Sequence, residues 1–133
     1  MSRYLIDTDW VVDVLRGQAA AIQTLREIAA DGLAISIITY GELVEGAVYG
    51  QNPATAQAGL EQFLEGKAIL PLTVEIMDRF GRVRGALRSR GNLIGDLDLL
   101  IGVTAVQHEL ELVTRNRRHF DRIPDLTFYS GSS

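Results

Sequence analysis

Short apolar runs alternate with segments of helical periodicity from one end of this chain to the other. The runs are too short for helices, and we therefore predict β-strands at residues 3–7, 33–36, 68–70, 111–114 and 126–129. Between them, apolar side chains recur at helical spacing and glycines end several segments. These segments predict helices at residues 9–16, 18–31, 38–49, 53–65, 73–90 and 97–108, and a single helical turn at 117–120. Strands separated by helices usually pair in parallel, so we predict an α/β fold: one domain with a mainly parallel β-sheet flanked by helices on both faces.

Length and composition fit one self-sufficient domain. The chain has 133 residues, of which 47% are hydrophobic, enough to bury a core without disulfides. We expect the domain to span residues 1–130, followed by a flexible C-terminal tail at 131–133. The chain has no cysteine, which excludes a thiol nucleophile and a cysteine-ligated zinc site. No signal-peptide pattern or membrane-spanning stretch is recognisable, so we expect a soluble, cytoplasmic protein with no membrane partner.

Four polar side chains stand where an apolar run gives way to a turn or a helix start: Asp7, Glu42, Asp98 and Asn116. In open α/β sheets, ligands bind beyond the carboxyl ends of the strands, where we predict these residues. Two carboxylates about 4 Å apart repel by on the order of 4 kcal/mol at an effective dielectric near 20, so gathered acids need protons or a cation. Oxygen-only ligands favour Mg²⁺ or Mn²⁺ over zinc.

Each of these residues also has a purely structural interpretation. Thr39 and Glu42 fit the capping-box pattern, in which Glu42 satisfies a backbone amide at a helix start. Asp98 could complement a helix dipole two residues after an Asp96 N-cap, and Asn116 could be an ordinary turn residue. Asp7 is harder to explain in this way, because a charge that ends a buried strand is costly unless it is paired or bound to a metal.

Basic residues are unevenly distributed. The net charge is −4, which argues against indiscriminate binding of nucleic acid, yet all nine basic residues after residue 70 are arginines. They form one group around Arg82 and another that includes Arg115 and Arg117. Arginine binds phosphate through a planar fork, so we expect Arg82, Arg115 and Arg117 to contact a polyanionic substrate. The alternative is that both groups are simply solvated helix faces.

Together these segments resemble the PIN domain ribonucleases, and among them the VapC-type toxins of toxin–antitoxin systems. The resemblance is carried by YLIDTD at 4–9, SIITYGEL at 36–43, IGDLDLLI at 94–101 and LVTRN at 112–116, followed by Phe120 and the sequence Arg122-Ile123-Pro124. Each motif is weak alone, but all occur in the family order and span nearly the whole chain.

The resemblance implies a metal-dependent endoribonuclease, a cognate VapB-type antitoxin that blocks the site, and commonly a homodimer. It assigns the metal-site acids to Asp7, Glu42 and Asp98, with Asn116 at a position that is Asp or Asn among relatives. Our hypothesis is that Asp7 and Asp98 hold one Mg²⁺ or Mn²⁺ ion, while Glu42 orients or deprotonates the attacking water and Asn116 positions it. In one departure from the family pattern, His119 stands where an acid is often found, which implies a weaker metal site.

Two other functions fit parts of the sequence. Asp7-Thr8-Asp9 at a strand end looks like the aspartyl-phosphate motif of haloacid dehalogenase-like phosphatases, but Lys67, the one lysine of the chain, precedes a strand instead of following one. A non-catalytic PIN-like module that binds RNA or a protein partner is the stronger alternative. RNA cleavage that EDTA abolishes would distinguish the enzyme from the module.

Overall fold

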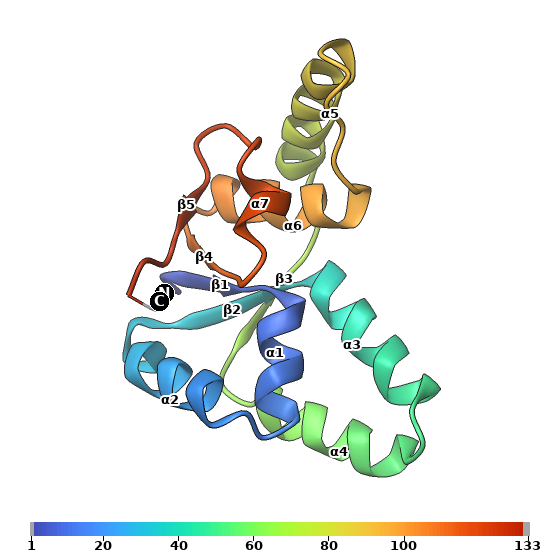
Figure 1. Ribbon diagram of the computed structural model, residues 1–133, viewed down its shortest axis with the longest axis vertical. Helices are drawn as coiled ribbons and strands as arrows, with labels where there is room; N and C mark the ends of the chain where they lie inside the picture. The colour runs from blue at the N-terminus through green and yellow to red at the C-terminus, as the bar shows by residue number, and fades with distance from the viewer. Residues whose placement is uncertain (1, 132–133) are drawn as a thin grey trace.

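Five parallel strands form a single sheet in the order β3-β2-β1-β4-β5 in the computed structural model, which describes residues 2–131 (Figure 1). The strands are β1 (Tyr4–Ile6), β2 (Leu33–Ser36), β3 (Ala68–Leu70), β4 (Glu111–Val113) and β5 (Thr127–Phe128). Every predicted strand is present at its expected place in the chain.

Helices fill the connections between the strands. They are α1 (Thr8–Leu15), α2 (Ala19–Ile28), a 3₁₀ turn (Ala29–Asp31), α3 (Ile37–Tyr49), α4 (Pro53–Leu64), α5 (Val74–Ser89), α6 (Asp96–Gln107) and α7 (Arg117–Phe120). These bounds confirm the predicted helices to within a few residues, a margin typical of helix ends.

The helices cover the sheet on both faces, which confirms the predicted fold class. On one face, Tyr4 and Ile6 of β1 pack with apolar side chains of α1, α2, α3 and α4. On the other face, Leu5 packs with side chains of α5, α6 and α7. Figure 1 shows α1, α2 and α4 on one side of the strands and α6 and α7 on the other. β1 is buried on both faces, as expected for the central strand of a parallel sheet.

The order of the strands places a switch point beside β1. The chain first builds the sheet outward from β1 through β2 to β3, and then crosses to the other side of β1 to add β4 and β5. Ile6 pairs with Val113, and the Asp7 amide donates to the Val113 carbonyl at 2.9 Å. Chain segments diverge beyond such a point and leave a crevice at the carboxyl ends of the strands. Asp7 and Thr114 are the first residues beyond β1 and β4 at this crevice.

Two helix starts differ from the sequence interpretation. α3 begins at Ile37, and its N-cap is Ser36, whose hydroxyl accepts from the Ile38 amide at 3.0 Å. The capping-box interpretation of Thr39 and Glu42 is therefore wrong, because both residues lie inside the helix. α6 begins at Asp96 with Gly95 as its N-cap, so Asp96 is not the cap.

Two further expectations concern the membrane and the chain end. Among residues 2–131, no helix combines the length and the apolar character needed to span a membrane. Of the tail expected at 131–133, residues 132 and 133 lie outside the described residues.

Candidate active site

Asp7 lies at the centre of the candidate site, where β1 ends and α1 begins. Its carboxylate is buried and accepts two hydrogen bonds, one from the Thr8 amide to Oδ1 at 2.8 Å and one from the Thr114 hydroxyl to Oδ2 at 2.7 Å. Asp7 is also the N-cap residue of α1. The acid is therefore fixed by its own helix and by the residue that follows β4.

Burial and a second acid raise the pKa of Asp7. Burial of the Asp7 carboxyl is the larger cause and the nearby Asp9 carboxylate the next, and together they raise its pKa from 3.8 to about 7 despite the hydrogen bonds from Thr114 and Thr8. In addition, Asp9 Oδ1 is buried and has no hydrogen-bond partner among residues 2–131. Two adjacent carboxylates, with one buried oxygen unpartnered, form a donor set that suits a hard cation such as Mg²⁺ or Mn²⁺.

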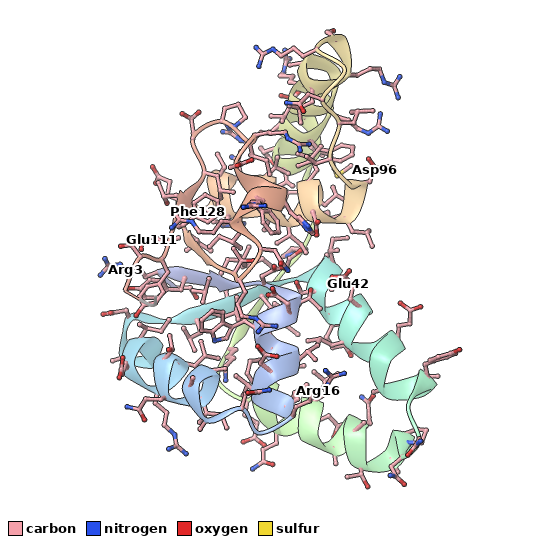
Figure 2. The ribbon with its side chains drawn as sticks, in the orientation of Figure 1. Arg3, Arg16, Glu42, Asp96, Glu111 and Phe128 are labelled. Carbon is pink, nitrogen blue, oxygen red and sulfur yellow. The ribbon has the colours of Figure 1, made fainter. Side chains whose placement is uncertain are left out.

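Glu42 is linked to this centre by a hydrogen bond from the Thr8 hydroxyl. The Thr8 hydroxyl donates to Glu42 Oε1 at 2.6 Å and forms a hydrogen bond with the Thr39 hydroxyl at 2.9 Å. Glu42 lies near the amino end of α3, on the side that faces α1 (Figure 2). The Glu42 carboxylate is thus bonded to Thr8, the residue next to Asp7, and does not cap its own helix.

Asn116 is linked to the same acids from the segment that follows β4, on the other side of the switch point. Its carboxamide Nδ2 donates to Asp9 Oδ2 at 2.8 Å, and its backbone amide donates to the Thr114 hydroxyl at 3.0 Å. The residues that follow β1 and β4 are therefore connected by side-chain hydrogen bonds. The structure brings Asp7, Glu42 and Asn116 into one network that also includes Asp9.

Asp98 is the exception among the four residues. It lies half-buried in the first turn of α6, and its Oδ2 is 3.2 Å from Nδ1 of His119. Its hydrogen bond within residues 2–131 is to His119 and not to the Asp7 network. In the same described range, no three acidic, histidine or cysteine side chains are grouped closely enough to hold a metal ion. α3 contacts both α1 and α6, so Asp98 is on a helix adjacent to the network but is directed toward His119.

The three candidate arginines do not lie together. Arg115 and Arg117 line a hollow of about 430 Å³ that also includes Thr114, the residue that donates to Asp7. Arg82 lies on α5, paired with Asp78 at 2.9 Å, and lines a different hollow. Arg115 and Arg117 are thus next to the acids, whereas Arg82 is not among the residues of this network.

Sequence reasoning missed the threonines that organise the site. The Thr8 hydroxyl donates to Glu42 and the Thr114 hydroxyl to Asp7, while the Thr39 hydroxyl bonds to that of Thr8. A signal was available for Thr8 and Thr114, because Thr8 directly follows the strand-end acid and Thr114 ends the run before Asn116. Arg118 and Arg122, which belong to the second arginine group of the sequence, line a hollow of about 270 Å³ with Asp98 and His119.

The chain is similar to known proteins over nearly its whole length. The model of the PIN domain family matches residues 4–126. The chain belongs to the PIN domain family. This PIN domain is 36% identical to Ribonuclease VapC19 of Mycobacterium tuberculosis over 122 residues, which covers 92% of this chain and 95% of the relative.

Two solved structures extend the likeness to three dimensions. The crystal structure of VapBC2 from Rickettsia felis, bound to a DNA fragment from its promoter, matches this PIN domain with a TM-score of 0.88 and 29% identity, covering 95% of this chain and 96% of the other. A toxin–antitoxin complex from Klebsiella pneumoniae matches with a TM-score of 0.72 and 29% identity, covering 93% and 95%.

The phosphatase alternative does not fit a PIN domain, and the position of its lysine argues against it as well. Lys67 precedes β3, at the opposite end of the parallel strands from Asp7. Its Nζ donates to the Phe63 carbonyl at 2.6 Å, so it is engaged within its own segment. A phosphorylated Asp7 would therefore have no lysine beside it.

Proposed function

We propose that this PIN domain is a metal-dependent endoribonuclease and the toxin of a toxin–antitoxin pair. The observation that carries the proposal is the Asp7 and Asp9 carboxylate pair at the switch point of the sheet, which has a buried unpartnered oxygen, a direct hydrogen bond from Asn116 to Asp9 and a link to Glu42 through Thr8. A relative named as a ribonuclease, similar over 92% of this chain, supports the same activity.

The metal ligands that we propose are Asp7 and Asp98, with Asp9 close to the same position. Because all of these donors are carboxylate oxygens, Mg²⁺ or Mn²⁺ is the cation that we expect. To reach the cation, the Asp98 carboxylate would exchange its hydrogen bond with His119 for a metal contact. When bound, such an ion lowers the pKa of a coordinated water and offsets the charge that grows on the phosphate.

The remaining residues act on the water and on the RNA. Glu42 orients the attacking water or accepts its proton, and the Thr8 hydroxyl at 2.6 Å fixes one oxygen of that carboxylate. The Asn116 carboxamide, held by its bond to Asp9, positions the water. Arg115 and Arg117 contact phosphates of the strand that flank the cleaved bond.

We also propose a VapB-type antitoxin as the protein partner, which would block this site, and a homodimer of the toxin. The solved complexes to which this PIN domain is similar are described as VapBC2 and as a toxin–antitoxin complex. A non-catalytic module that binds RNA would share these relatives but not the dependence on metal.

We expect the purified protein to cleave single-stranded RNA in Mg²⁺ or Mn²⁺ and to lose that activity in excess EDTA. Loss of several kcal/mol of transition-state stabilisation corresponds to a fall in rate on the order of 100-fold or more. The measurement is the initial rate on a fluorophore-labelled RNA. A Glu42→Gln protein, purified in the same way, controls for contaminating nucleases and should be inactive with or without metal. No cleavage in either metal would favour the binding module, and a rate that EDTA does not change would contradict the dependence on metal.

A further inference from the structure

The hollow beside Trp10 adjoins the candidate active site. Side chains of α1, α2 and the segment after β4 surround about 430 Å³, and Trp10, Ala20 and Thr114 are part of its lining. The Thr114 hydroxyl donates to Asp7 Oδ2 at 2.7 Å, so a single side chain separates this hollow from the central acid. A ligand in the hollow would therefore lie immediately next to the proposed cleavage point.

Trp10 contributes a buried donor to this region. Its side chain is 7% exposed, and the indole N–H has no hydrogen-bond partner within the part of the chain that the structure describes. A buried donor without an acceptor is costly, and a ligand that supplied an acceptor would remove that cost.

Hydrogen-bond donors and acceptors, some of them charged, surround the hollow. Asp13 is buried and pairs with Arg115 at 3.1 Å, and the Arg117 guanidinium lies 4.5 Å from the centre of the Phe128 ring. Gln18 adds a side chain that can both donate and accept. A phosphate has only acceptors and would face the Asp13 carboxylate, whereas the edge of a nucleobase carries donors and acceptors side by side. The lining beside Asp13 therefore suits a base, while the exposed Arg115 and Arg117 can still contact the phosphates next to it.

We infer that this hollow is a nucleobase subsite, which receives the base of the nucleotide adjacent to the cleaved phosphate and gives the enzyme its sequence preference. The Trp10 indole N–H donates to the base, and Asp13 and Gln18 contact its edge. The place of this subsite in a cleavage reaction rests on the proposed function, but the binding of a base does not.

The test uses the one tryptophan of the chain as a reporter. A ¹⁵N-labelled protein gives a single indole N–H signal, and we expect this signal to move in a saturable way when at least one of the four nucleoside monophosphates is added in EDTA. Ribose 5-phosphate, which has the phosphate but no base, should leave the signal in place. No movement with any nucleotide, or equal movement with ribose 5-phosphate, would overturn the inference.

A matched pair of variants tests whether the base occupies the hollow itself. Ala19 and Ala20 are both exposed at the start of α2, but only Ala20 is part of the lining. We expect Ala20→Leu to weaken nucleotide binding at least fivefold and to change which bonds of a mixed-sequence RNA are cut, while Ala19→Leu behaves as the parent. Equal affinities in both variants would place the base elsewhere and refute the subsite. Failure of the proposed function is distinguishable, because nucleotides would then bind in EDTA while no RNA was cut in Mg²⁺.

Discussion

The Asp7→Asn protein will lose RNA cleavage and yet be more stable than the parent at about pH 8 in EDTA. In the folded protein the pKa of the Asp7 carboxyl is about 7, against 3.8 for the free group. Between these values the folded state keeps a proton that the unfolded state has released, so the free energy of unfolding falls as the pH rises. The stabilisation is complete below about pH 4 and is lost above pH 7, with an upper limit of about 4 kcal/mol.

An asparagine at position 7 removes the loss of stability at high pH, because a neutral carboxamide does not ionise and the cost of burying a charge at this position is avoided. We expect urea unfolding in EDTA to give Asp7→Asn and the parent similar stability at or below about pH 4, and the variant about 1–4 kcal/mol more stability at pH 8. Asp31→Asn, which changes an exposed carboxylate, should follow the parent at both values. If the parent were as stable at pH 8 as Asp7→Asn, Asp7 would not be a strained, buried acid.

The Asp98→Asn protein should cleave RNA at least about 100-fold more slowly than the parent, because it loses a proposed metal ligand while keeping its shape. Asp96→Asn is the matched control, since Asp96, labelled in Figure 2, lies two residues earlier on the same helix. Asp96 pairs with Arg84 at 2.7 Å. Its rate should stay within a few-fold of the parent. The measurement is the initial rate of RNA cleavage in saturating Mg²⁺.

Both variants must first be shown to fold, by circular dichroism and by their unfolding curves. A folded Asp98→Asn protein that cleaves RNA as fast as the parent would remove Asp98 from the metal site. A loss of equal size in Asp96→Asn would mean that the amino end of α6 matters for its structure and not for a ligand at position 98.

Most of the fold could be predicted because local patterns and tertiary packing agree. β3 and α7 lie at the residues predicted from apolar runs and turn signals. The capping residue of α3 could not be assigned from sequence alone, because Ser36 and Thr39 are both residue types that cap helices. Tertiary structure decides between the two residues. Ser36 is completely buried at the end of β2, and the helix begins directly after it.

The candidate site could be predicted only where it depends on strand ends. Asp7 and Asn116 follow neighbouring strands, so their proximity followed from the topology. The direction of a side chain depends on contacts that the sequence does not show, which explains why Asp98 is paired with His119 and why Thr8 holds Glu42. The two arginine groups also looked equivalent in sequence, although Arg115 lies beside the acids and Arg82 pairs with Asp78 on α5.

The most direct measurement is the position of Mn²⁺ in crystals of the protein, located by its anomalous scattering. If Asp7 and Asp98 hold one cation, a single peak should appear at coordinating distance, about 2.1 Å for a Mg²⁺-type site, from oxygens of both carboxylates. The His119 side chain should then no longer contact Asp98. A peak bound by neither acid, or none at saturating Mn²⁺, would contradict the proposal that these acids form one metal centre.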